Sequence, residues 1–200
     1  MSVIGEITKA IRMTLVLWVL TAIIYPVLVL AIAQVAFPYQ ANGSLVENLE
    51  GKLIGSALIG QAFTSDQYFS SRPSTTTYSQ GKEPSPTGLS GASNLAPSNP
   101  GLLKRIQTEV DRLQEINVQP TADLVYTSAS SLDPHITVES ALSQLERVAT
   151  ARNLPSEDIA PLIVEHTQGR FLGIFGEPTV NVLNLNRELD IFAFSRQQTQ

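Results

Sequence analysis

The sequence contains no cysteine and only two histidines, which removes several kinds of chemistry from consideration. Without cysteine there is no disulfide, no thiol nucleophile and no Cys-ligated metal. A two-histidine metal site would require His135 and His166 to meet across a long stretch of chain, and nothing in the pattern supports that approach. The lack of cysteine by itself does not indicate a compartment, because many exported bacterial domains have no disulfide.

Positive charge is also scarce. There are 13 Lys+Arg against 18 Asp+Glu, giving a formal net charge of -5. Nucleic-acid binding depends on cations that neutralise phosphates, so we expect no nucleic-acid partner. A chain of 200 residues is long enough for one domain with a proper hydrophobic core, here expected beside a membrane anchor.

Apolar residues are concentrated near the N-terminus. Residues 14–36 carry no charge and are rich in Leu, Val, Ile and Ala. A helix needs roughly 20 such residues to cross the hydrocarbon core, so we predict a transmembrane helix over 13–37. Its candidate anchoring and assembly residues are two amphipathic aromatics, a proline expected to bend the helix near Ile23, and an amide near the outer end: Trp18, Tyr25, Pro26 and Gln34.

The flanking charges predict the orientation of this helix. Lys9 and Arg12 precede it, whereas Glu47 and Glu50 follow it before the first basic residue. By the positive-inside rule residues 1–12 are cytoplasmic and the rest of the chain lies outside the cytoplasm. The alternative is a cleaved signal peptide, because residues 31–33 have the small-x-small form of a cleavage site. Both alternatives export the domain.

Beyond the anchor we expect a linker over 38–51 and one α+β domain over 52–200. The region 70–99 is rich in Ser, Thr, Pro and Gly and should be irregular. We predict a buried first strand around residues 53–59, helices beginning at Pro100, after Thr137 and at Pro155, and strands over 124–126 and 180–185.

Six short blocks taken in order resemble the C subunits of the Kdp-type potassium-transporting P-type ATPases of bacteria. The resemblance covers nearly the whole chain. Ala92, Ser131 and Thr179 depart from the family pattern, the first two because glycine is usual there and the third because a basic residue is. The blocks are Gly55-Ser56-Ala57-Leu58-Ile59-Gly60-Gln61 with Phe63, Tyr68-Phe69 with Arg72-Pro73, Ser90-Gly91-Ala92-Ser93-Asn94-Leu95 with Ser98-Asn99-Pro100, Ala122-Asp123-Leu124-Val125, Ser128 to Ile136 with Gln144, Arg147-Val148-Ala149 and Ala151-Arg152, and Val180-Asn181-Val182-Leu183 with Leu185-Asn186.

The resemblance implies a single-pass accessory subunit of the bacterial inner membrane. Its partners would be a P-type ATPase catalytic subunit, a channel-like potassium-binding subunit and the lipid bilayer, and the complex would use ATP, Mg²⁺ and K⁺. This chain contains neither the Asp-Lys-Thr-Gly phosphorylation motif nor a Gly-x-x-x-x-Gly-Lys-Ser/Thr phosphate loop. We therefore expect a non-catalytic role in assembly or stabilisation, with no cofactor held by the chain.

The segment 89–93 loosely resembles the signature loop of ABC transporters. A weak nucleotide site would comprise Ser90, Gly91, Ser93 and Asn94, consistent with a subunit that raises the ATP affinity of the pump. The other interpretation is a turn leading to the cap at Asn99, and the predicted export of the domain favours it.

A second segment, Asp133-Pro134-His135, pairs an acid with an imidazole, as metal and acid/base sites do. A turn with local hydrogen bonds ahead of the second helix is the stronger interpretation, so we assign no catalytic or metal-binding residue. Five polar residues remain candidates for a partner interface: Arg72, Asn94, Asp133, His135 and Asn181. A membrane-tethered periplasmic hydrolase or binding module is the remaining alternative, although no Gly-x-Ser-x-Gly nucleophile motif is present.

Overall fold

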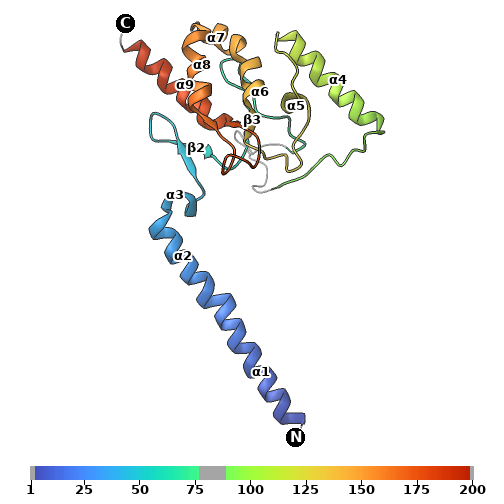
Figure 1. Cartoon of the computed structure of the whole chain (residues 1–200), viewed down its shortest axis with the longest axis vertical. Coiled ribbons are helices and arrows are strands. Elements are labelled where there is room, and N and C mark those ends of the chain that lie inside the picture. The colour runs from blue at the N-terminus through green and yellow to red at the C-terminus, as the bar shows by residue number, and fades with distance from the viewer. Residues whose placement is uncertain (1–2, 77–88, 199–200) are drawn as a thin grey trace. The chain divides into compact units, whose positions relative to one another are not determined.

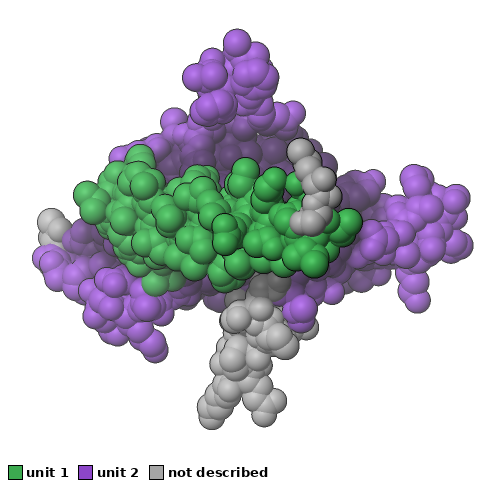
Figure 2. All heavy atoms as spheres, turned by 90° about the horizontal axis from the view of Figure 1, so that it is seen from below, with its two compact units in different colours: residues 1–45 green, residues 46–200 purple. Residues whose placement is uncertain are grey.

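A computed structural model describes residues 3–76 and 89–198 of the chain (Figure 1). The chain divides into two compact units, residues 1–45 and 46–200, coloured separately in Figure 2. The first unit contains the apolar helix, and the second contains the mixed helices and strands. The predicted class, one N-terminal apolar helix followed by an α+β domain, is confirmed.

The apolar helix is continuous from Val3 to Ala36 and is the one helix in the described residues that is long and apolar enough to cross a membrane. It consists of α1 (Val3–Val19), a π-helical turn η1 (Leu20–Ile24) and α2 (Tyr25–Ala36). Pro26 has no N–H to donate, and π turns commonly absorb such a disturbance. The π turn lies where the sequence predicts a bend, and the helix runs through it unbroken. The short α3 (Pro38–Ala41) follows.

The centre of the second unit is a three-stranded antiparallel sheet in the order β3 (His135–Thr137), β5 (Thr179–Asn181), β4 (Thr167–Gln168). His135 pairs with Asn181, and Thr167 pairs with Val180. Four helices, grouped together in Figure 1, pack with this sheet: α6 (Val138–Ser143), α7 (Leu145–Arg152), α8 (Ser156–Glu165) and α9 (Val182–Gln197).

The domain has two apolar clusters. The larger one joins the sheet to these four helices and includes Phe69, which is fully buried although it lies in irregular chain. The smaller one joins α4 (Pro100–Glu115) to α5 (Ala122–Val125). Burial of such side chains is the main favourable contribution to folding.

The predicted helix at Pro100 is confirmed together with its cap. The Asn99 side chain accepts a hydrogen bond from the Gly101 amide at 2.8 Å. Leu113 is buried, whereas Leu103 is 62% exposed and lies off the buried stripe. The described parts of region 70–99, residues 70–76 and 89–99, are irregular as predicted, and residues 77–88 lie outside the described ranges.

One predicted strand is wrong and another is too long. Residues 122–125 form the short helix α5, and the run from Val180 is a strand for only two residues before α9 begins. The Asn181 side chain accepts a hydrogen bond from the Asn184 amide at 3.1 Å, which caps α9 and converts strand into helix. The local alternation of apolar residues did not reveal this cap.

Other expectations need smaller corrections. The first strand exists as β2 (Leu53–Ser56), paired with β1 (Leu45–Glu47), but Leu53 is 54% exposed, so the strand is not buried. The helix after Thr137 is interrupted at Gln144, and Leu142 is 47% exposed. A two-stranded ribbon has too little surface to bury its own apolar residues, which explains the exposure of β2.

Candidate functional site

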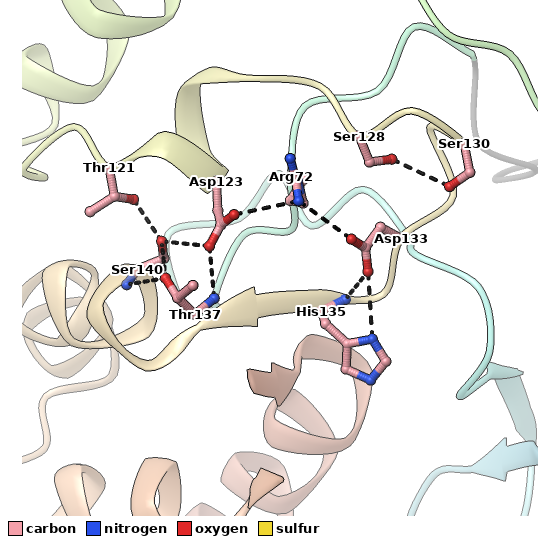
Figure 3. A network of polar contacts seen from close by, with 9 residues as sticks. All are labelled: Arg72, Thr121, Asp123, Ser128, Ser130, Asp133, His135, Thr137 and Ser140. Atoms are coloured by element: carbon pink, nitrogen blue, oxygen red, sulfur yellow. Dashed lines mark hydrogen bonds and ion pairs between the residues drawn. The ribbon is translucent and has the colours of Figure 1, made fainter. Parts of the chain in front are cut away.

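The candidate site is organised around one arginine and two aspartates (Figure 3). Nη1 of Arg72 lies 3.4 Å from Oδ1 of Asp123 and 3.4 Å from Oδ2 of Asp133. Arg72 comes from the irregular chain after Phe69, Asp123 from α5, and Asp133 from the turn before β3. A single guanidinium therefore joins three segments that are far apart in the sequence, and its charge is balanced within the chain.

Asp123 also accepts hydrogen bonds from the residues at the start of α6. Its Oδ2 accepts hydrogen bonds from the Thr137 amide at 2.8 Å and from the Ser140 hydroxyl at 3.2 Å. The Thr137 hydroxyl in turn caps α6 by accepting from the Ser140 amide. The carboxylate therefore fixes the start of α6 as well as holding Arg72, and Figure 3 shows both contacts.

Asp133-Pro134-His135 is a turn that leads into β3. Oδ1 of Asp133 accepts from the His135 amide at 3.0 Å and lies 3.5 Å from Nδ1 of the same residue. Hydrogen bonding from the His135 side chain, then from its backbone amide, and the charge of Arg72 lower the pKa of Asp133 below 3.8, against the opposing effect of burial. The carboxylate of Asp133 and the imidazole of His135 therefore interact with each other, as expected for a turn with local hydrogen bonds.

The two histidines are used separately. Nδ1 of His166 lies 3.0 Å from the Leu162 carbonyl oxygen, and its Nε2 lies 3.9 Å from Oε2 of Glu188. Across residues 3–76 and 89–198 there is no cluster of three or more His, Asp or Glu side chains arranged to hold a metal ion.

The weak nucleotide candidates lie in a loop that is hydrogen-bonded to the turn at Ser130 and Ser131. The Gly91 amide and the Ser90 hydroxyl both donate to the Ser130 carbonyl oxygen, at 3.2 and 3.0 Å. The Gly91 carbonyl accepts from the Ser131 hydroxyl at 2.6 Å. A phosphate-binding loop requires backbone amides that point into open space. The Gly91 amide does not meet this requirement, because it donates to the Ser130 carbonyl oxygen. Ser93 lies in the same irregular stretch, and Asn94 is exposed with a φ of 49°.

The backbone conformation of Ser131 explains why glycine is usual at this position in the family. Its φ is 58°, a left-handed conformation that glycine adopts without strain, and its side chain is 1% exposed. The hydroxyl accepts from the Thr75 amide at 3.1 Å and donates to Gly91, which offsets the strain that Cβ introduces. Ala92, by contrast, is not among the residues with positive φ.

The structure places Asn181 inside the domain, where it is 3% exposed. Besides capping α9, its Nδ2 donates to the Ala57 carbonyl oxygen at 2.8 Å. The anchor candidates Trp18, Tyr25 and Pro26 lie on the apolar helix, whereas Gln34 exchanges long hydrogen bonds of 3.4 and 3.3 Å with the Asn42 amide.

The sequence favours bracing of loop backbone by Asn186, but it did not reveal that Asn186 and Gln144 are buried or that they hold two consecutive backbone residues. Asn186 bonds both the N–H and the C=O of Phe69, and Gln144 does the same for Ser70. Arg147 adds hydrogen bonds to the carbonyl oxygens of Asp66 and Tyr68. The one available signal was that Gln144 and Asn186 both fall within otherwise apolar helical patterns, where an amide needs a partner.

These contacts border an open cleft of about 490 Å³ lined by three arginines, Arg72, Arg112 and Arg147. Arg112 pairs with Glu109 at 2.8 Å, and Arg147 lies 3.6 Å from Asp66. Burial lowers the pKa of Arg147, with a further contribution from the charge of Arg112 and an opposing one from Asp66. The positive charge of the cleft is thus largely compensated by its own acids.

Fold and site together define a single-helix membrane protein whose α+β domain uses its polar side chains to tie its own segments together. The chain matches the family model described as KdpC, K⁺-transporting ATPase, c chain, over residues 7–191, and it belongs to this family.

Named relatives agree with the family assignment over the full length. The chain is 57% identical to the potassium-transporting ATPase KdpC subunit of Anabaena sp. (strain L31), with 100% of both chains covered. It is 60% identical to the subunit of the same name from Synechocystis sp. (strain PCC 6803), over 90% of this chain and 95% of the relative. The Gloeobacter violaceus subunit is 49% identical over 95% of this chain and 98% of its own length.

Proposed function

We propose that this chain is the non-catalytic C subunit of a potassium-transporting P-type ATPase complex, in which it stabilises the assembly of the catalytic and potassium-binding subunits. The observation that carries the proposal is the full-length similarity to subunits named for that ATPase. ATP, Mg²⁺ and K⁺ would be bound by the partner subunits.

The internal use of the polar residues supports a structural role. Arg72 is paired with Asp123 and Asp133, and the buried amides Gln144 and Asn186 are occupied by backbone groups. Acid/base or nucleophilic catalysis requires side chains that converge on a site where a substrate can reach them. The network instead holds the long irregular segment around Phe69 against the helices, as a rigid bracing domain requires.

We further propose that the domain lies outside the cytoplasm and the N-terminus inside. The support is the pair Lys9 and Arg12 ahead of the apolar helix. In this orientation the domain would face the potassium-entry side of the pump. A direct effect on a cytoplasmic nucleotide site would then be impossible, and the engaged Gly91 amide agrees with that.

The apolar helix contributes less to assembly than the domain does in this proposal. Its candidate polar contact, Gln34, already bonds to Asn42. Interhelical hydrogen bonds in membranes are worth about 0.6 kcal/mol on average, whereas an exported domain can bury many side chains against a partner.

Copurification from native membranes tests the proposal. With an affinity tag after Gln200, the full chain in mild detergent should recover a P-type ATPase catalytic subunit and a channel-like membrane subunit. Gln34→Leu should recover them at near wild-type yield, and a chain limited to residues 1–51 should not. Recovery of the full chain alone would reject the proposed function, and full recovery by residues 1–51 would reject the dominance of the domain.

A further inference from the structure

The connection between β4 and β5 carries a small hairpin with an apolar tip, residues 171–175. Phe171 and Phe175 pair across it, with backbone N–H to O distances of 2.9 and 3.0 Å in the two directions. The four large apolar side chains of the tip are all exposed: Phe171 71%, Leu172 74%, Ile174 73% and Phe175 61%. Such a concentration on five consecutive residues marks an interaction site, whereas single exposed apolar residues need no explanation.

The turn at the tip places a leucine in a backbone conformation that leucine rarely adopts. Leu172 and Gly173 both have positive φ, 52° and 74°. Among residues other than glycine, Asn and Asp are the ones enriched at positive φ, and a bulky residue such as leucine is an outlier there. Leu172 is exposed, so packing within the domain does not offset this backbone strain. A contact outside the domain would explain why leucine occupies the position.

We propose that the apolar tip is the docking element that inserts into an apolar pocket on a partner subunit of the pump, an inference that rests on the function proposed above. The backbone hydrogen bonds between Phe171 and Phe175 hold the tip in shape before binding, so little conformational entropy is lost on docking. Aromatic and aliphatic side chains flanked by an arginine are typical of the energetic centre of an interface. Arg170 at the base would pair with an acidic group at the rim of the pocket.

The charge of the domain favours a protein pocket over the lipid surface. Residues 46–200 contain 11 Lys+Arg and 17 Asp+Glu, so the domain has no excess of positive charge with which to bind anionic headgroups. The tip has neither Trp nor Tyr, the aromatics that concentrate at membrane interfaces, and its flanks carry one charge of each sign, Arg170 and Glu177. Surface-binding segments instead carry clusters of basic residues.

Photo-crosslinking identifies the occupant directly. A benzophenone amino acid replaces Leu172 in the full-length tagged chain, expressed together with the pump subunits in native membranes. Ultraviolet light should give an adduct with a pump subunit, and the same replacement at Leu103, a 62% exposed leucine on α4, should not. An adduct with lipid alone, or no adduct at position 172, would overturn the proposal.

A strain-relieving variant separates docking from a purely structural role. Leu172→Asn suits the left-handed turn, so it should leave the thermal midpoint of the full chain unchanged or raised, yet lower recovery of the pump subunits by about tenfold. Leu103→Asn is the matched control and should leave recovery unchanged. Unchanged recovery with Leu172→Asn would show that the tip does not dock.

The same experiments distinguish the two proposals. If the wild-type chain recovers no ATPase subunit, the proposed function is wrong, and the docking assignment is wrong with it. If the wild type recovers the subunits while position 172 neither crosslinks to them nor affects their recovery, only the docking assignment is wrong.

Discussion

Asn186 holds Phe69 by both of its backbone polar groups. Oδ1 of Asn186 accepts from the Phe69 amide at 2.8 Å, and Nδ2 donates to the Phe69 carbonyl oxygen at 2.9 Å. The two residues are 117 positions apart, and both are buried. A single amide on α9 thereby gives a buried piece of irregular chain the hydrogen bonds that a sheet would otherwise provide.

Asn186→Ala should therefore destabilise the domain strongly. It leaves an N–H and a C=O of Phe69 buried without partners, at about 1 to 3 kcal/mol each, so we expect a loss of about 2 to 6 kcal/mol. Urea unfolding of the full chain in detergent, followed by circular dichroism, measures it. Asn184→Ala removes the same kind of side chain from the same helix without touching Phe69, and it should cost less. Equal losses in the two variants would contradict the role assigned to Asn186.

Ser131 allows backbone strain to be separated from hydrogen bonding. Ser131→Ala removes the bonds to Thr75 and Gly91 and keeps a Cβ at a φ of 58°. Ser131→Gly removes the same bonds but relieves the left-handed strain, which is about 1 to 2 kcal/mol. We expect both variants to be less stable than wild type, with Gly more stable than Ala by about 1 kcal/mol in the same urea assay. An Ala variant at least as stable as the Gly variant would show that the position carries no strain.

The lowered pKa of Asp133 predicts a loss of stability in acid. Its folded pKa lies below the ordinary value of 3.8, because the carboxylate is stabilised by His135 and Arg72. A depressed folded pKa contributes stability that is present above the unfolded pKa and is lost as the pH falls through the folded one. The difference in unfolding free energy between wild type and Asp133→Asn should thus be constant near neutral pH and narrow below pH 3.8.

Urea unfolding between pH 7 and pH 3 measures this difference. Asp111→Asn, on α4, controls for the removal of one negative charge. A gap between wild type and Asp133→Asn that stays constant down to pH 3 would show that the contacts of Asp133 with His135 and Arg72 do not stabilise the fold.

The natural absence of cysteine makes the predicted topology directly measurable. Thr8→Cys lies before the apolar run, and Val164→Cys is a 69% exposed position on α8. In intact spheroplasts a membrane-impermeant maleimide should label Val164→Cys and should label Thr8→Cys only after the membrane is permeabilised. The reverse pattern would place the domain in the cytoplasm and restore the nucleotide hypothesis.

Retention of the anchor is a separate expectation. The apolar run is longer than the roughly 7 to 15 residues of an ordinary signal core, so the mature chain should begin at or near Met1 and stay in the membrane after a carbonate wash. Intact-mass measurement decides it. A mature N-terminus at Gln34 would show cleavage after Ala33.

Sequence alone determined the features that depend on neighbouring residues. The apolar helix follows from an uncharged run, because crossing a bilayer depends on length and hydropathy only. The start of α4 follows from Asn99 and Pro100, because a cap satisfies amides two or three residues away. The α+β class and the family resemblance were readable in the same way, since each rests on short patterns taken in order.

Tertiary structure decided what depends on distant partners. The run from Val180 alternates like a strand, yet most of it forms α9, because the helix places Val182, Leu185 and Leu189 in the larger core. The pairing of Arg72 with Asp123 and Asp133 could not be foreseen, because a charged side chain suits solvent, a partner or an internal acid equally well until the chain brings the acids to it. The burial of Phe69 was likewise settled only by Asn186, since irregular backbone can enter a core only where remote side chains satisfy its hydrogen bonds.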